Sequence, residues 1–238
     1  MKAHSDAGAS RDAAAPQPSQ AKTIPYVAPF ALFILCLGVR SYLPIAPEYE
    51  YPARVLLVSI ALAAFSRPVL DLRVSKPLGS VAVGLLVFAV WIAPDLLWPG
   101  YRQHWLFQNS LTTAAGTGTS EAMRQNVPFL AFRVLGSVAL VPVIEELFWR
   151  GWLMRYLIAP EFGSIALGTY APLSFWLTAV LFASEHGPYW DVGLLAGVIY
   201  NAWLVRTRRL GDCILAHAGT NGALAAYVLC FGKWNYWL

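Results

Sequence analysis

The sequence predicts an all-α integral membrane protein, a polytopic bundle of about seven or eight transmembrane helices. Three observations indicate this class. Of the 238 residues, 58% are hydrophobic and only 13% are charged, which is far from the balance of a soluble globular domain. Several charge-free runs approach the roughly 20 residues that a spanning helix needs. The chain also has 10 Trp and 11 Tyr, whose amphipathic rings collect at membrane interfaces.

The first segment, residues 1–22, is rich in Ala, Ser, Gln and Pro and has no apolar face. We expect it to be a disordered tail. It lacks the short apolar core and small-residue cleavage site of a signal peptide. The first span is therefore expected to stay attached as a membrane anchor.

The remaining chain divides into residues 23–126, expected to hold the N-terminal membrane helices and a long loop, and residues 127–238, expected to form a catalytic membrane core. Four charge-free runs are the strongest candidates for spans. They are residues 23–39, 77–94, 162–184 and 213–232. The weaker candidates are residues 55–66, 127–144 (interrupted by Arg133) and 192–205.

Basic residues suggest how the chain crosses the membrane. If the tail is inside and each run crosses once, the basic connections fall on the cytoplasmic side, as the positive-inside rule requires, and the parity holds for seven crossings. The formal net charge of +4 then reflects topology and does not indicate nucleic-acid binding. The residues concerned are Lys2, Arg11, Lys22, Arg67, Arg73, Lys76, Arg150, Arg155, Arg206, Arg208 and Arg209.

The segment 145–150, EELFWR, places two adjacent carboxylates and an arginine in one of the most apolar parts of the chain. An ionised side chain at bilayer depth costs about 3 kcal/mol by insertion scales, so such groups usually mark function. On a helix, Glu146 and Arg150 share a face, while Glu145 is rotated by about 100°. Arg150 can hold one carboxylate ionised, which leaves the other as a candidate general base. The alternative is a structural ion pair at a cytoplasmic helix end.

His186 closes an apolar segment and is followed by Gly187 and Pro188, which end a helix. Phe182 lies one turn earlier on the same face, where its ring can form the wall of a dry substrate pocket. His186 is either a catalytic imidazole or an interfacial or helix-capping residue. The neighbouring Glu185 is either a competing base or an interfacial residue, and we favour the second.

His217 and Asn221 are four residues apart in the last apolar segment, so on a helix both side chains point the same way. Donors arranged like this can bind a developing oxyanion, and each is typically worth about 3 kcal/mol of transition-state stabilisation. The alternative is that both side chains form structural hydrogen bonds between helices, which the small residues Ala218, Gly219 and Gly222 allow to pack closely.

The order of the three motifs on successive apolar segments is more specific than any one of them. Glu-Glu-x-x-x-Arg, then Phe-x-x-x-His, then His-x-x-x-Asn resembles the CPBP family of intramembrane proteases, which includes the CAAX prenyl endopeptidases. The resemblance covers roughly residues 128–229 and matches all three motifs without substitution. Residues 145–153, 183–191 and 211–217 look like the branch that accompanies bacterial exosortase sorting systems for PEP-CTERM proteins.

The resemblance implies glutamate-dependent hydrolysis of a peptide bond, with no metal or other cofactor. Glu145 and His186 would activate a water molecule for attack on the peptide carbonyl. Glu146 and Arg150 would orient the site.

His217 and Asn221 would stabilise the tetrahedral oxyanion, and Phe182 would line the substrate pocket. The resemblance implies a membrane protein or lipidated peptide as substrate, in the lipid bilayer of a bacterial inner membrane, with components of an exosortase system as partners. The family's known members cut after a prenylated cysteine near a C-terminus. Most bacteria lack such substrates, so a prenyl group is not carried over as a requirement.

If every span is a straight helix that crosses the membrane once, the motif residues lie at different depths in the membrane. Glu145 and His217 would lie toward the cytoplasmic side, whereas His186 would come at the opposite end of its segment. Either the segment 162–186 is broken or re-entrant, or the number of spans is wrong. The family's usual eight helices favour the second explanation, by a split of the stretch 127–158.

Two other functions stay open. Two His and two Glu can in principle hold zinc, but a His-Glu-x-x-His pair is absent from the sequence and Asn221 is a poor zinc ligand. The polar residues can also serve a non-enzymatic scaffold, immunity or transport protein. The cysteines Cys36, Cys213 and Cys230 have no metal-ligand spacing and are expected to be small buried thiols.

Overall fold

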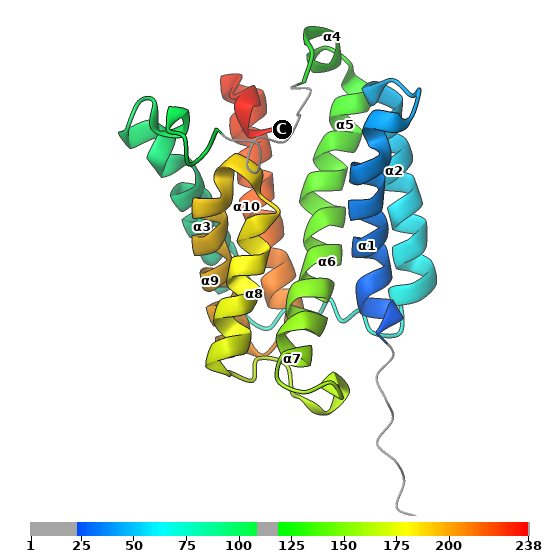
Figure 1. Ribbon diagram of the computed structural model, residues 1–238, viewed down its shortest axis with the longest axis vertical. Helices are drawn as coiled ribbons and strands as arrows, with labels where there is room; N and C mark the ends of the chain where they lie inside the picture. Colours follow the sequence, from blue (N-terminus) through cyan, green and yellow to red (C-terminus); the bar gives the residue numbers. More distant parts are fainter. Residues whose placement is uncertain (1–22, 109–118, 238) are drawn as a thin grey trace, which may run out of the picture.

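The computed structural model describes residues 23–108 and 119–237, and over these residues it is all-helical, with no strand. The long helices run side by side along the longest axis of the molecule (Figure 1). The predicted all-α class is therefore confirmed for the described part of the chain. The tail expected in residues 1–22 lies outside it.

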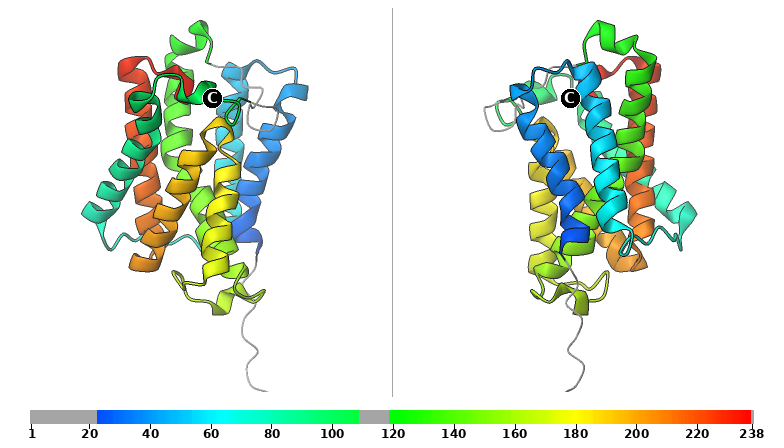
Figure 2. Two further views of the ribbon diagram at one scale, coloured as in Figure 1. Left: turned by 60° about the vertical axis from the view of Figure 1, so that its left-hand side comes forward. Right: turned by 90° about the vertical axis from the view of Figure 1, so that its right-hand side faces the viewer.

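Two antiparallel helices begin the bundle. α1 (Ile24–Val39) is followed by the short η1 (Arg40–Tyr42), and α2 (Pro47–Ala61) continues through a π-helical turn, η2 (Leu62–Ser66). α2 begins at a proline, whose fixed φ and missing N–H suit the first turn of a helix. Both helices pack against the central rod described next (Figure 2, right).

The central rod is one continuous helical stretch from Val127 to Tyr156, 30 residues long. It follows the short α4 (Glu121–Arg124). Its bounds are α5 (Val127–Leu135), η4 (Gly136–Leu140), α6 (Val141–Glu146), η5 (Leu147–Leu153) and α7 (Met154–Tyr156). The η4 and η5 segments are π-helical, a local widening that often occurs at functional sites. The expected split of residues 127–158 into two spans is wrong, because this stretch is a single rod.

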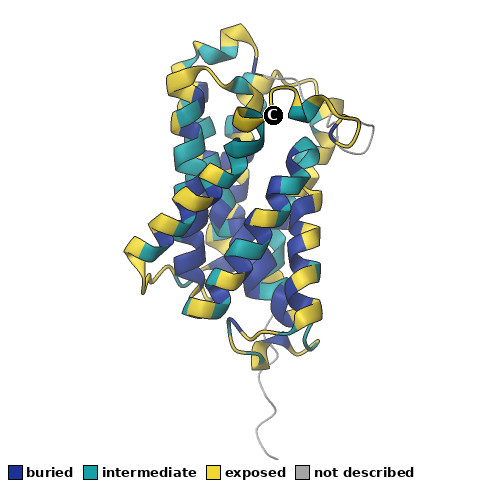
Figure 3. Ribbon diagram, turned by 90° about the vertical axis from the view of Figure 1, so that its left-hand side faces the viewer, coloured by how far each residue is buried: buried dark blue, intermediate teal, exposed yellow. Residues whose placement is uncertain are grey.

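The other long helices lie on the opposite side of the central rod from α1 and α2 (Figure 1). They are α3 (Pro77–Leu97), α8 (Pro172–Ser184), α9 (Trp190–Thr207) and α10 (Leu210–Phe231), with the short turns η3 (Tyr101–Gln103), η7 (Gly187–Tyr189) and η8 (Trp234–Tyr236). The short η6 (Phe162–Ser164) follows the central rod and packs against α7 and Tyr26 of α1. Buried residues gather where these helices face one another, and exposed residues cover their outer faces (Figure 3).

Close packing joins α3 to α10. A Cβ added at Gly84 would lie only 2.4 Å from the backbone oxygen of Ala216, so this position holds a glycine because the two backbones nearly touch. Asp212 fastens the start of α10, since its carboxylate accepts hydrogen bonds from the backbone N–H groups of Ser75 and Lys76 at 3.0 and 2.8 Å. These contacts fix the helix that carries His217 and Asn221.

Four stretches are long and apolar enough to cross a membrane: Ile24–Tyr42, Pro77–Leu97, Val127–Tyr156 and Leu210–Phe231. The count of seven or eight spans is not confirmed. The run 162–184 differs most from its expectation, because η6 and a loop occupy its first part and α8 begins only at Pro172. At 1.5 Å per residue, α8 is about 20 Å long, less than the roughly 30 Å of a hydrocarbon core.

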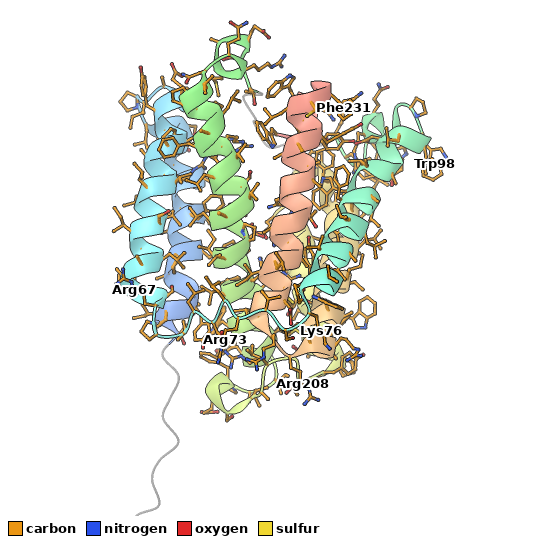
Figure 4. The ribbon with its side chains drawn as sticks, turned by 180° about the vertical axis from the view of Figure 1, so that it is seen from behind. Arg67, Arg73, Lys76, Trp98, Arg208 and Phe231 are labelled. Atoms are coloured by element: carbon orange, nitrogen blue, oxygen red, sulfur yellow. The ribbon has the colours of Figure 1, made fainter. Side chains whose placement is uncertain are left out.

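Basic side chains mark one end of the bundle. Arg67, Arg73, Lys76 and Arg208 lie at this end, opposite Trp98 and Phe231 (Figure 4). Arg150 was expected with them but is fully buried between helices. Of the three cysteines, Cys213 is buried, Cys36 is half-buried and Cys230 is exposed on the protein surface, so the expectation of three buried thiols holds only for Cys213.

Candidate active site

A buried ion pair forms the centre of the site. Arg150 Nη1 donates to Glu146 Oε1 at 3.1 Å, and both side chains are completely buried. His217 Nδ1 lies 3.0 Å from the same carboxylate oxygen. The i, i+4 spacing on the central rod brings the first two groups together, and packing against α10 brings the third.

Arg150 is held on every side. Its Nε donates to Asn201 Oδ1 at 2.9 Å, its Nη2 donates to the Gly197 carbonyl at 3.3 Å, and its guanidinium carbon lies 4.4 Å from the centre of the Phe182 ring. Asn201 in turn donates to the Phe175 carbonyl at 2.8 Å. Breaking one partner of such a buried pair is costly, so the network fixes Glu146 and Arg150 rigidly.

Asn201 is a residue of this network that the motif analysis missed. It lies in α9 within the apolar run 192–205 and is completely buried. A lone amide in an apolar run is itself a signal, because polar side chains at membrane depth need a partner. Tyr200, stacked on the His217 ring at a centroid distance of 5.1 Å, carried no such signal.

Glu145 has different surroundings from Glu146. Its Oε2 makes no hydrogen bond with any described residue and lies 4.0 Å from His217 Nε2. The carboxylate lines a cavity, whereas Glu146 is tied to Arg150. The two adjacent carboxylates therefore have separate environments, as their 100° offset on a helix predicts.

His186 follows α8 at the end of its last turn. Its Nδ1 lies 2.7 Å from the Phe182 carbonyl oxygen, and its ring packs against Trp91 at a centroid distance of 5.2 Å. A Cβ added at Gly193 would lie 3.2 Å from this ring, so the α9 backbone also confines it. Because α8 is short, His186 lies inside the bundle on the same cavity as Glu145 and His217. The expected mismatch in depth is thus resolved by the length of α8.

Asn221 lies one turn beyond His217 on α10. Its Nδ2 donates to the Ser137 carbonyl at 2.8 Å, in the π-helical part of the central rod. An amide nitrogen has two N–H groups, so this contact leaves a second one. Asn221 also lines the cavity, which agrees with the expected common face of His217 and Asn221.

The cavity has a volume of about 260 Å³. Its lining combines charged and polar side chains with aromatic and aliphatic ones, as in most small-molecule and peptide sites. Its walls near the motifs are Glu145, Phe182, His186, Tyr200, His217 and Asn221. The Phe182 ring lies 6.1 Å from that of His217, and its expected role in a substrate pocket stays a prediction.

Glu185 does not face this cavity. Its Oε1 accepts a hydrogen bond from Trp149 Nε1 at 2.9 Å, and it lines an adjoining, more apolar cavity. Within residues 23–108 and 119–237, no three His, Cys, Asp or Glu side chains are grouped so that they could hold a metal ion.

Comparison with known proteins relates one part of the chain to a family. No match was found among curated proteins or among solved structures. The matching region begins with the central rod, contains every motif residue named above and ends within α10. Proteins of this family are CAAX-type proteases, which are hydrolases, and together with the four apolar helices the match suggests a membrane protein. Residues 127–223 match the family described as Type II CAAX prenyl endopeptidase Rce1-like.

Proposed function

We propose that this protein is an intramembrane endopeptidase that hydrolyses a peptide bond of a membrane-associated protein with a glutamate-activated water molecule. The observation that carries the proposal is the environment of Glu145. Glu145 lines a cavity that His186, His217 and Asn221 also line, and its Oε2 makes no hydrogen bond with any described residue. A general base needs such an acceptor and room for a water molecule.

In the proposed reaction, Glu145, assisted by His186, removes a proton from a water molecule as its oxygen attacks the peptide carbonyl carbon. The tetrahedral oxyanion accepts hydrogen bonds from His217 Nε2 and from the second N–H of Asn221. Because Nδ1 of His217 donates to Glu146, donation from Nε2 requires the doubly protonated ring. The proton taken by Glu145 then passes to the amide nitrogen, the C–N bond breaks, and the products are a carboxylic acid and an amine.

Glu146 and Arg150 serve as positioning residues. Glu146 sets the orientation of the His217 ring, and Arg150 holds Glu146 in place. A rigid support of this kind matters because small displacements of catalytic groups cost large factors in rate.

The first test compares three purified proteins on a membrane-inserted peptide substrate: wild type, Glu145→Gln and Glu185→Gln. General bases typically contribute about 10²- to 10⁴-fold, so Glu145→Gln is expected to lose activity by this factor. Glu185→Gln removes a carboxylate outside the cavity and is the matched control. Equal activity of Glu145→Gln and wild type would show that Glu145 is not the base.

The narrower features of the proposal rest on the motif resemblance. They are membership of the exosortase-associated branch, a place in a bacterial inner membrane, and substrates sorted by that system. The basic end shown in Figure 4 supports an orientation with this end in the cytoplasm. Co-purification of a substrate with the Glu145→Gln protein would test the branch, because a substrate outside exosortase sorting would contradict it.

A further inference from the structure

A short connection between α8 and α9 carries His186. It contains η7, which begins at Gly187 with a φ of 52°, a left-handed conformation that favours glycine. The connection lies below the ends of α5 and α10, inside the outline of the bundle (Figures 1 and 2). Irregular backbone inside a membrane bundle needs polar partners from the rest of the protein. The partner of this connection comes from a segment that is distant in the sequence.

Arg102 of η3 contacts both the connection and the beginning of α9. Its Nη1 donates to the Pro188 carbonyl at 2.7 Å, and the same nitrogen donates to Oδ1 of Asp191 in the first turn of α9. The neighbouring Tyr101 donates from its hydroxyl group to Asp191 Oδ2 at 3.0 Å. The η3 segment therefore joins the residues after His186 to α9.

Arg102 is itself held in one place. Its guanidinium carbon lies 4.5 Å from the centre of the Tyr189 ring and 4.9 Å from that of the Phe107 ring. Its Nε lies 3.4 Å from Asp95 Oδ1, and its side chain is only 15% exposed. Exposed ion pairs contribute little because water competes for both charges. A mostly buried guanidinium between rings and carboxylates keeps a fixed geometry, so it can fix the backbone that it contacts.

The contacts of Arg102 bear on the His186 ring from two directions. On one side, His186 Nδ1 donates to the Phe182 carbonyl, since a carbonyl oxygen can only accept. On the other side, the ring lies against Gly193, two residues beyond Asp191. Arg102 binds Asp191 and also the backbone just after His186, so a change at Arg102 reaches the ring through the connection and through α9.

We propose that Arg102 is a positioning residue for the hydrolysis, which holds the connection after α8 so that the His186 ring keeps one orientation on the cavity. The inference rests on the proposed function. Arg102 does not line the cavity, so it acts through His186. It also precedes residues 127–223, so the family match does not include it. Small displacements of a catalytic group cost large factors in rate, which makes a contact outside the cavity important for turnover.

The first measurement observes the His186 ring directly. Full-length protein with isotopically labelled histidine is studied by NMR in detergent micelles, and His186→Ala identifies the His186 signals among those of the four histidines. Wild type is expected to give one set of ring-nitrogen signals for His186, with a proton on Nδ1. Arg102→Gln is expected to give several sets or broadened signals, because the ring then samples several orientations. The His217 signals should stay unchanged and serve as the internal control.

The second measurement follows cleavage of a membrane-inserted peptide. Arg102→Gln is expected to lower kcat by about 10- to 100-fold and to change KM by less than about three-fold, because it removes a positioning contact and no substrate contact. Arg102→Lys keeps a positive charge for Asp191 and should restore part of the loss. Arg124→Gln removes an arginine that pairs with Glu121, away from η7, and should cleave at the wild-type rate.

Combination with His186→Ala separates positioning from general damage to the fold. Once the ring is gone, Arg102 has nothing to position, so Arg102→Gln should lower the residual activity of His186→Ala by less than about two-fold. An equal loss in both backgrounds would overturn the proposal. Unchanged His186 signals in Arg102→Gln would also overturn it, and these signals decide if the residual activity is too low to measure. If Arg102→Gln does not fold, Asp191→Asn weakens the same contact and decides by the same criteria.

Failure of the proposed function gives a different result. A protein whose His186 signals respond to Arg102→Gln but which never cleaves a peptide would contradict the endopeptidase and leave the contact between Arg102 and the His186 connection standing. Cleavage that depends on Glu145 but is unchanged in Arg102→Gln would support the endopeptidase and contradict the positioning role.

Discussion

The two adjacent glutamates have different surroundings because a helix turns them to different neighbours, and the proposed function gives them different roles. Glu146 is buried against Arg150 and His217, while Glu145 lines the cavity and its Oε2 makes no hydrogen bond with any described residue. Two neighbouring carboxylates in such different environments are typical of catalytic pairs. This difference is the support for the proposed catalytic role of the EELFWR segment, which stays a prediction until the variants are assayed.

The two oxyanion candidates should differ in importance. His217→Ala should abolish peptide hydrolysis, because it removes the side chain that lies between Glu145 and Glu146. Asn221→Ala removes one donor and should lower turnover by about 10²-fold, with measurable residual activity. Cleavage rates of the purified variants check this, with Asn235→Ala as a control outside the cavity. If Asn221→Ala were as inactive as His217→Ala, the expected difference in importance between Asn221 and His217 would be wrong.

The elements position the site through helix length and close packing. The 13-residue α8 brings His186 to the depth of Glu145, and the contact between Gly84 and Ala216 sets the position of α10. The positions of His217 and its neighbours therefore depend on how closely α3 packs against α10.

Gly84→Ala should destabilise the protein. The added Cβ would lie 2.4 Å from the Ala216 oxygen and 3.1 Å from the Thr220 nitrogen, so α3 and α10 must separate. Overpacking typically costs about 1–3 kcal/mol, and the shift should also lower activity by moving His217. Thermal unfolding in detergent measures the loss. Gly219→Ala, whose Cβ meets only the Gly84 Cα at 3.8 Å, is the control, and equal melting temperatures of the two variants would contradict this account.

The sequence predicted which segments form helices well, and the residues at which the helices begin and end less well. Charge-free runs marked α1, α3 and α10 because apolar length is what a bilayer requires. The same signal extended α8 back to residue 162, since composition alone does not separate a helix from an apolar loop. The start at Pro172 follows from proline's preference for the first helical turn, which hydropathy does not register.

For the whole molecule, the described chain begins and ends at opposite ends of the bundle (Figure 1). Reporter proteins fused before residue 1 and after residue 238 are therefore expected on opposite sides of the membrane, with the first in the cytoplasm. Compartment-specific enzymatic reporters measure this. Both reporters on one side would contradict the arrangement of the helices, and a first reporter outside the cytoplasm would contradict the orientation with the basic end in the cytoplasm.

The convergence of the motifs was predictable from the sequence, because polar groups at membrane depth need each other. The rest of the cavity was not. Arg40, Arg54 and Arg133 come from three helices with no shared motif, and only their packing reveals that they line one cavity. Asn201 likewise becomes part of the site only when α9 meets the central rod.

The central claim, a glutamate-activated water, is tested most directly by activity before and after exhaustive chelation. Purified wild-type protein and Glu145→Gln are assayed on one cleavable peptide in detergent, with bound metal measured in parallel. The glutamate mechanism predicts unchanged wild-type activity after chelation and loss of activity only in Glu145→Gln. Activity that disappears with the chelator and returns with stoichiometric zinc would contradict it and establish a metalloprotease, since a catalytic zinc needs about three protein ligands and an open position.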